Sequence, residues 1–190
     1  MKVSIGVSNR HVHLNEKDLY LLFGDGYKLN AARPIKQPEQ FAAKEVVTIL
    51  TEKGSIENVR VRGPVRSYTQ VEISKTDAYK LGINPPIRES GDIVGSAPIS
   101  IIGPCGQIDL KEGCIIATRH IHLTQKQKEL YGLTEVETVD VILPVEKGGI
   151  LYNVSLKVSE QAYFELHIDT DDANAHLVTS SDFAEIICTK

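Results

Sequence analysis

The sequence predicts an α+β, β-rich fold that arose by internal duplication, with two small β-barrel domains that each carry short helices. Three observations support this prediction. A short motif occurs twice, several stretches alternate apolar and polar residues as half-buried strands do, and helix-capping residues follow these stretches at matching places. A chain of 190 residues, of which 42% are hydrophobic, is long enough to bury one sizeable core or two small ones.

The duplication is seen in matches that recur in one order. "RHVHL" at residues 10–14 returns as "RHIHL" at 119–123, an offset of 109 residues, and "VEISKTDA" at 71–78 matches "LHIDTDDA" at 166–173 at an offset of 95. The difference between these offsets gives the first copy 14 extra residues, and the proline-containing segment 30–43 is the natural place for them.

Hairpins are expected in both copies. The β-rich runs 45–63 and 139–158 are each interrupted at Lys-Gly, which predicts a hairpin, and 99–110 predicts one more. The segment 84–98 is rich in proline and glycine and is expected to link the repeats. The expected domains are residues 1–91 and 92–190, with strands open to exchange between the repeats.

Short helices are expected where capping residues follow a strand. Asn15 in the first copy and Thr124 in the second come directly after the repeated histidine motif. Ser74 and Asp169 follow the last predicted strand of each copy and have an aspartate three residues later. Each copy therefore contains two short helices at equivalent places.

Four of the six histidines lie in the repeated HxH motif. Residues at i and i+2 diverge on a helix but share one face of a strand, about 6.5 Å apart, so two imidazoles reach one ion only on a strand. Residues 2–13 alternate as one continuous strand that would carry Val3 and Ile5 on the same face as His11 and His13. The HxH pairs therefore predict metal clamps.

A third donor stands at a matched position in each copy, because the repeat alignment makes Glu72 equivalent to His167. Catalytic zinc takes three protein ligands and keeps one position open. Histidines kept only for packing are the alternative, but packing does not explain an exchange of Glu for His, which share little beyond metal binding. His176 is left over and is expected to be structural. The predicted sites are His11, His13 and Glu72 in the first copy and His120, His122 and His167 in the second.

Charge and cysteine content exclude several classes of function. The formal net charge of -4 and a pI near 5.9 provide no basic field for bulk nucleic-acid binding. The start of the chain has no continuous apolar run, so neither a signal peptide nor a membrane span is expected. The three cysteines, Cys105, Cys114 and Cys188, form no disulfide framework and suit a reducing compartment such as the cytoplasm.

Six motifs along nearly the whole chain resemble a known family: "GVSNRHVHL", "QPEQFAA", "GPVRSYTQVEIS", "IRESGD", "ATRHIHL" and "LHIDTDDANA". They are similar to motifs of the PduL-type phosphotransacylases, the phosphate propanoyltransferases associated with propanediol utilisation. The resemblance implies two β-barrels, two zinc ions at their junction held by the ligand sets above, and the reaction acyl-CoA + phosphate ⇌ acyl phosphate + CoA.

The resemblance also carries expectations about partners and location. Members of the family that work in bacterial microcompartments tend to carry an N-terminal encapsulation extension, whereas here His11 follows Met1 by ten residues. A cytoplasmic enzyme that makes acetyl or propanoyl phosphate is therefore expected, with an acyl kinase as a candidate downstream partner and a homo-oligomer as the assembly.

Arg66 in "GPVRSYTQVE" is the expected phosphate-binding and catalytic residue. A guanidinium matches phosphate bidentately, and an even spacing from Glu72 would keep both side chains on one strand face. The alternative is a solvated surface arginine, and the resemblance favours the phosphate binder. Ser90 in "RESG" is a second candidate near the phosphate. Arg10 and Arg119 fall on the opposite face from the HxH histidines, where a structural ion pair and a contact with CoA phosphates are comparable options.

The expected mechanism is direct, zinc-assisted attack of phosphate on the thioester. Two other functions fit the same ligands: a zinc-dependent thioester hydrolase, and a non-enzymatic metal-binding module whose closed sites stabilise the fold. An acyl-enzyme on Cys114 is a further route for acyl transfer, but the apolar run "CIIA" favours a buried structural cysteine.

Overall fold

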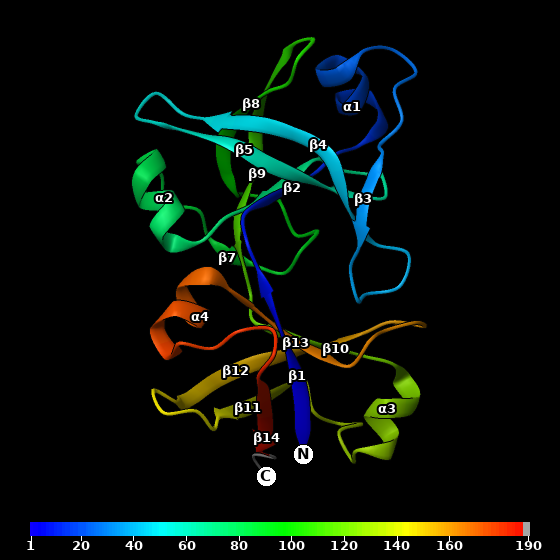
Figure 1. Ribbon diagram of the computed structural model, residues 1–190, viewed down its shortest axis with the longest axis vertical. Helices are drawn as coiled ribbons and strands as arrows, with labels where there is room; N and C mark the ends of the chain where they lie inside the picture. The colour runs from blue at the N-terminus through cyan, green and yellow to red at the C-terminus, as the bar shows by residue number, and fades with distance from the viewer. Residues whose placement is uncertain (188–190) are drawn as a thin grey trace. The chain divides into compact units, whose positions relative to one another are not determined.

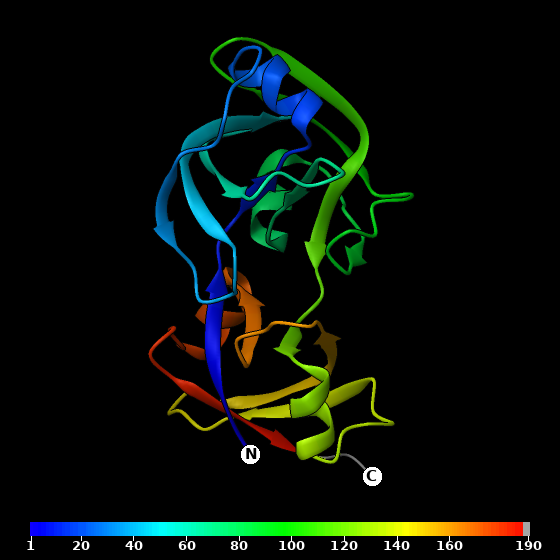
Figure 2. The same cartoon turned by 90° about the vertical axis from the view of Figure 1, so that its right-hand side faces the viewer.

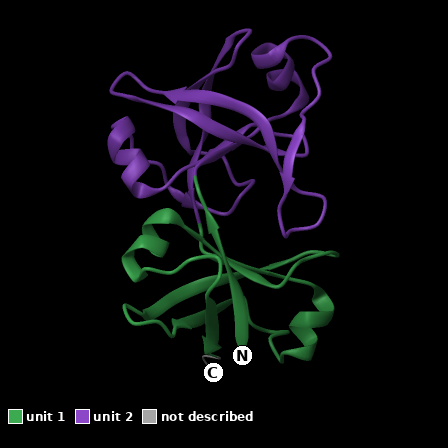
Figure 3. Ribbon diagram, viewed as in Figure 1, with its two compact units in different colours: residues 1–9, 118–190 green, residues 10–117 purple. Residues whose placement is uncertain are grey.

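Strands dominate the computed structural model, which describes residues 1–187 (Figure 1). The chain divides into two compact units: unit 1 comprises residues 1–9 and 118–190, and unit 2 comprises residues 10–117 (Figure 3). Each unit contains a closed barrel of six strands and two short helices, which confirms the predicted fold class. Among the described residues, no helix is long and apolar enough to cross a bilayer.

The barrel of unit 1 closes in the order β1-β13-β10-β12-β11-β14. Its helices α3 and α4 each begin at a predicted N-cap, Thr124 and Asp169, whose side-chain oxygens accept backbone N–H groups of the first turn. The elements of unit 1 are β1 (Lys2–Ser8), β10 (His120–Leu123), α3 (Gln125–Leu130), β11 (Thr138–Leu143), β12 (Gly149–Val158), β13 (Glu165–Asp169), α4 (Thr170–His176) and β14 (Phe183–Ile187).

The barrel of unit 2 closes in the order β9-β6-β2-β5-β4-β8, and β8 returns to β9. Two further strands extend it, since β3 pairs with β4 and β7 pairs with β9. The elements of unit 2 are β2 (His11–His13), α1 (Glu16–Phe23), β3 (Ala31–Pro34), β4 (Phe41–Leu50), β5 (Ser55–Gly63), β6 (Gln70–Glu72), α2 (Lys75–Leu81), β7 (Ile87–Arg88), β8 (Ala97–Ile102) and β9 (Gln107–Ala117).

The two barrels have the same topology. Each HxH strand, β2 or β10, runs antiparallel to the strand with the third donor, β6 or β13, and parallel to the second strand of the hairpin, β5 or β12. The three predicted hairpins are confirmed as β4–β5, β8–β9 and β11–β12. In Figures 1 and 2, α1 lies beside the β8–β9 turn, where the Cys105 N–H donates to the Leu22 carbonyl at 3.0 Å.

The first strand of each copy is paired within the other copy's barrel. β1 pairs with β13 and β14 in unit 1, whereas its counterpart β9 pairs with β6 and β8 in unit 2. The compact units follow the barrels and not the repeats, so the division of the repeats at residues 1–91 and 92–190 stays a prediction. The segment 84–98, which was expected to link the repeats, lies inside unit 2.

The prediction of one continuous strand over residues 2–13 is wrong. β1 ends at Ser8 and β2 begins at His11, and the chain passes from unit 1 to unit 2 between Asn9 and Arg10. The alternation had two separate causes, because Val3 and Ile5 are buried in the core of unit 1 while the histidines belong to unit 2.

Each barrel has its own apolar core, and the middle residue of each HxH motif is part of it. Val12 and Ile121 are fully buried. Burial of an aliphatic side chain of this size contributes about 1.5–3 kcal/mol, so these residues anchor the HxH strands. Because side chains alternate along a strand, the flanking histidines point to the opposite face from the core.

Candidate metal and phosphate sites

The structure brings His11, His13 and Glu72 together in unit 2. In the antiparallel pair β2–β6, His11 lies opposite Glu72. The Nε2 atom of His11 is 3.3 Å from one carboxylate oxygen of Glu72, and the Nε2 atom of His13 is 3.7 Å from the other. All three side chains are buried, and their donor atoms lie within 4.8 Å of one another.

Burial and charge keep this cluster in the form that binds a cation. Burial alone would raise the pKa of Glu72, but His11, His13 and Arg62 hold that pKa well below its ordinary value. Burial, followed by the charge of His11, lowers the pKa of His13. An ionised carboxylate beside an imidazole whose pKa is lowered is the donor chemistry that suits a divalent metal.

Arg66 is joined to this cluster by a chain of hydrogen bonds. Its Nη1 donates to the Tyr68 hydroxyl at 2.9 Å and to the Ser90 hydroxyl at 3.1 Å. Gln70, fully buried, donates from Nε2 to Ser90 at 3.0 Å and to Glu72 at 2.7 Å. The charge of Arg66 also contributes to the lowered pKa of His13, so the guanidinium lies within electrostatic range of the cluster.

Arg66 reaches this place by a different route from the one its spacing predicts. β6 begins only at Gln70, so no continuous strand joins Arg66 to Glu72. Instead the Arg66 backbone N–H donates to the Leu14 carbonyl at 2.9 Å, just after the HxH strand. The even spacing is coincidental, and the long-range bond to Ser90 fixes the side chain.

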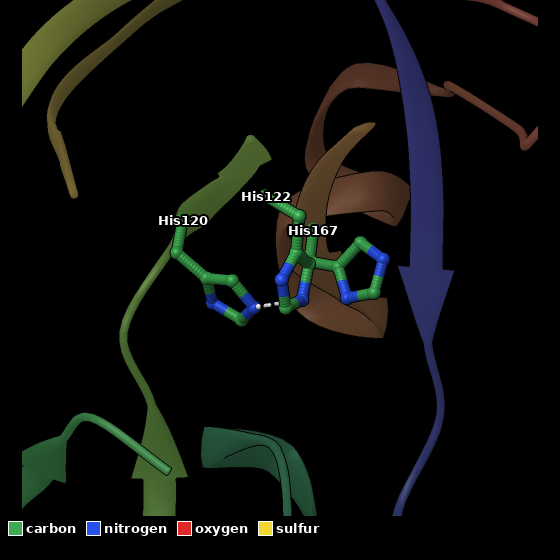
Figure 4. Close-up of side chains that lie close together, drawn as sticks. All are labelled: His120, His122 and His167. Carbon is green, nitrogen blue, oxygen red and sulfur yellow. Dashed lines mark hydrogen bonds between the residues drawn. The ribbon is translucent and has the colours of Figure 1, made fainter. Parts of the chain in front are cut away.

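The second cluster, in unit 1, is formed by His120 and His122 on β10 and His167 on β13 (Figure 4). His120 lies opposite His167 in the antiparallel pair, and the Nε2 atoms of His120 and His122 are 3.2 Å apart. His167 is buried, and the other two are half-buried. The three ring centroids lie 4.6–5.2 Å apart, so the imidazoles converge on one point.

Comparison with known proteins agrees with the resemblance seen in the motifs. The family model described as phosphate propanoyltransferase matches residues 4–179. The chain belongs to the phosphate propanoyltransferase family. It is 50% identical over 188 residues to the phosphate propanoyltransferase of Thermotoga maritima, which covers 97% of this chain and 89% of that protein.

Other relatives extend the same result. The phosphate propanoyltransferase of Priestia megaterium is 51% identical over 180 residues, covering 95% of this chain and 83% of that protein. The one from Clostridioides difficile is 41% identical over 185 residues, covering 97% and 88%. As a phosphate propanoyltransferase, the enzyme is an acyltransferase, and the family name implies phosphate and propanoyl-CoA as its substrates.

Both clusters of this phosphate propanoyltransferase fit a zinc ion by the chemistry and spacing of their donors. Ligands at about 2.0–2.1 Å from a tetrahedral zinc lie about 3.3 Å from each other. The His11–Glu72 and His120–His122 separations of 3.3 and 3.2 Å match this edge length. Each cluster offers three protein donors, the number that catalytic zinc sites use.

Arg10 and Arg119 make matched ion pairs, as the structural option left open by the sequence expects. Arg10 bonds Asp77 through Nε at 2.9 Å and Nη2 at 2.7 Å, and Arg119 bonds Asp172 in the same way at 2.7 Å. Each aspartate lies in the first turn of the helix that follows the third-donor strand. These arginines therefore brace the start of each HxH strand against a helix.

The remaining candidates lie outside both clusters. His176 belongs to neither, and its Nδ1 lies 3.2 Å from the Lys147 carbonyl. Cys114 is fully buried, and burial together with the charge of Asp77 raises the pKa of its thiol to about 12. Cys105 is exposed, and Cys188 lies outside the described residues.

Three residues of the site carried no recognised signal in the sequence. In unit 2, Tyr68 accepts a hydrogen bond from Arg66, and Gln70 joins Ser90 to Glu72. Glu165, two residues before His167, lies 2.9 Å from its Nε2 atom. The repeat alignment could have found Gln70 and Glu165, because they occupy the same position relative to the third donor.

Proposed function

We propose that this phosphate propanoyltransferase moves a propanoyl or acetyl group from CoA to phosphate by direct attack, with one zinc ion in each histidine cluster. The observation that carries the proposal is the connected chain from Arg66 through Ser90 and Gln70 to Glu72. It joins an anion-binding side chain to a candidate metal ligand by direct hydrogen bonds. A structural metal site would not need such a connection.

Arg66 is proposed to bind the phosphate. Both of its side-chain hydrogen bonds use Nη1, and neither Nε nor Nη2 makes a hydrogen bond to any residue within 1–187. Nε and Nη2 together form the planar fork that matches two phosphate oxygens. Tyr68 and Ser90 hold the guanidinium by its other end, so this fork is oriented before substrate arrives.

The transfer step needs no covalent intermediate on the protein. An oxygen of phosphate forms a bond to the thioester carbon, the C–S bond breaks, and sulfur leaves as the CoA thiolate. Zinc held by these ligands would act as a Lewis acid and stabilise the negative charge of the phosphate and of the carbonyl oxygen under attack. Arg66 orients the phosphate, which converts an encounter of two solutes into a reaction within one site.

The acyl-enzyme route through Cys114 is not supported. A thiol with a pKa of about 12 and no exposed surface is not a thiolate at neutral pH and is not accessible to acyl-CoA. Cys114→Ala is expected to keep phosphate-dependent transfer. Exchange of labelled CoA into acyl-CoA without phosphate would reveal an acyl-enzyme, and none is expected.

The proposal is tested by thiol release from propanoyl-CoA and acetyl-CoA, with and without phosphate and after chelation. Release that needs both phosphate and metal, with acyl phosphate as the other product, supports it. Thiol release without phosphate would identify a thioester hydrolase, and no release in any condition would favour a metal-binding module.

Two expectations about partners accompany this function. The acyl phosphate product is the substrate class of an acyl kinase, which a coupled assay with ADP would detect as ATP formation. Self-association stays a prediction, and light scattering during size-exclusion chromatography measures it directly.

A further inference from the structure

The residue two positions before the third donor is equivalent in the two barrels and is buried in both. Gln70 lies opposite His13 in the β2–β6 pair, and Glu165 lies opposite His122 in the β10–β13 pair. Their exposed fractions are 0% and 4%. Buried polar side chains need hydrogen-bond partners, so these two positions must serve the polar groups beside them.

Each of these side chains bonds the third donor of its own cluster, with complementary chemistry. Gln70 donates its amide N–H to the carboxylate of Glu72 at 2.7 Å. In unit 1 the donor and acceptor are exchanged, because the carboxylate of Glu165 accepts from Nε2 of His167 at 2.9 Å. The candidate carboxylate ligand, Glu72, thus accepts a hydrogen bond from an amide, and the candidate imidazole ligand, His167, donates one to a carboxylate.

The bond to Glu165 leaves the other nitrogen of His167 for a metal. Figure 4 shows one ring nitrogen of His167 directed toward His122 and the other turned away from it. Since Nε2 is the atom bonded to Glu165, Nδ1 is the nitrogen that faces the cluster. A histidine ligand held through its second nitrogen by a carboxylate has a fixed tautomer and a fixed ring orientation.

On the other side of β13, the neighbouring strand β1 lies close to the Glu165–His167 pair. Gly6 of β1 lies opposite His167, and a Cβ atom at residue 6 would be 2.8 Å from the Glu165 carboxyl group and 2.9 Å from the His167 ring. Real Cβ contacts are essentially never this short, so any side chain at residue 6 would displace the Glu165–His167 pair. In unit 2 the residue opposite Glu72 is Ile115. The room left by Gly6 is therefore specific to the His167–Glu165 pair.

We propose that Glu165 is a positioning residue that orients His167 to bind metal through Nδ1 and increases the basicity of that nitrogen. This inference rests on the proposed function, because it assumes that the cluster of unit 1 binds zinc. It also explains the different ligand sets. Each cluster then has one carboxylate, Glu72 as a ligand in unit 2 and Glu165 behind a ligand in unit 1.

The test measures metal affinity at the cluster of unit 1 alone. In a His13→Ala background that disables the other cluster, zinc affinity is measured by competition with a chromophoric chelator, and geometry by the visible spectrum of bound Co²⁺. Glu165→Gln is expected to weaken zinc binding about 10–100-fold, the usual effect of removing a residue that hydrogen-bonds a metal ligand. The positions of the Co²⁺ absorption bands should not change, because the ligands themselves are the same. Glu185→Gln, which makes the same change of charge on β14, is the matched control and is expected to bind as the background does.

A second variant makes the test independent of the stability of Glu165→Gln. Gly6→Ala changes no polar group but displaces the Glu165–His167 pair, so it is expected to weaken zinc binding as well. Unchanged affinity in both variants would overturn the inference. A Co²⁺ spectrum that loses its tetrahedral bands in Glu165→Gln would also overturn it, because Glu165 would then be a ligand. Absence of binding in the His13→Ala background itself would instead overturn the proposed zinc site of unit 1, and the inference with it.

Discussion

Replacement of Arg66 is expected to impair the use of phosphate while leaving the fold intact. The free fork of Nε and Nη2 can make two charge-assisted hydrogen bonds to phosphate, each worth about 1.5–3 kcal/mol. Their loss in Arg66→Ala corresponds to about 3–6 kcal/mol, or roughly 10²–10⁴-fold in kcat/KM for phosphate. Arg66→Lys keeps the charge but loses the fork, so a fall of roughly 10–100-fold is expected.

The assay is initial-rate thiol release with phosphate varied at a saturating concentration of propanoyl-CoA. Arg60→Ala is the matched control, because it removes the same charge from unit 2 while its guanidinium bonds only the carbonyls of Ala43 and Lys44 in that unit. The backbone bond from Arg66 to Leu14 is independent of the side chain, so the thermal midpoint should change little. A kcat/KM for phosphate within threefold of the Arg60→Ala value would refute the assignment of Arg66.

Three further predictions concern metal, pH and the ion pairs. Chelation is expected to abolish acyl transfer, and added zinc is expected to restore it, with two ions per chain measured by mass spectrometry. Circular dichroism of the chelated protein should show that the barrels, with their apolar cores, are still folded. Unfolding on chelation would instead indicate that the metal is structural. Because the pKa of His13 is lowered on folding, the unfolded state binds more protons below pH 6.5, so the metal-free protein should lose stability from about pH 6.5 downward, by up to about 1.4 kcal/mol per unit. The pKa of Glu72 is also lowered, but the stability that it contributes is lost only below about pH 4.5, so it does not affect the range from pH 6.5 to 5.5. A His13→Asn variant should therefore show a flatter dependence of the thermal midpoint on pH in that range. An equally steep dependence would contradict the assignment to His13. Arg10→Ala is expected to lower the free energy of unfolding in urea by about 1.5–3 kcal/mol, because it leaves the buried Asp77 carboxylate without its partner. Arg119→Ala should lower it by less, because Asp172 is more exposed. Equal losses would argue against burial as the cause.

The ion pairs Arg10–Asp77 and Arg119–Asp172 occupy equivalent positions in the two copies and make the same structural contact. Arg10 and Arg119 precede the HxH strands, and both bond the first turn of the following helix. A bidentate guanidinium–carboxylate pair constrains direction as well as distance. Each pair therefore restrains the residue directly before the HxH strand, which helps to position the histidines that follow.

The candidate ligands were accessible from the sequence because they depend on local rules. Period-2 alternation determines that residues i and i+2 share a face, and two copies of the HxH motif allowed the third donors to be found by alignment. The exchange of Glu72 for His167 at one position pointed to metal binding, since few other roles suit both residues. The hairpins and helix caps followed from short-range signals in the same way.

The sequence by itself thus determined the duplication, the strand-rich class and the donor types, because each is encoded within a few neighbouring residues. Only the tertiary structure decided that β1 and β9 pair within the barrel of the other copy, that Arg66 is held by Ser90 and not by strand continuity, and that Gln70 and Glu165 bond the third donors. Alternation specifies which face a side chain occupies but not which strand lies beside it. Strand pairing and buried hydrogen bonds join residues far apart in the chain, and they are selected by the packing of the whole barrel.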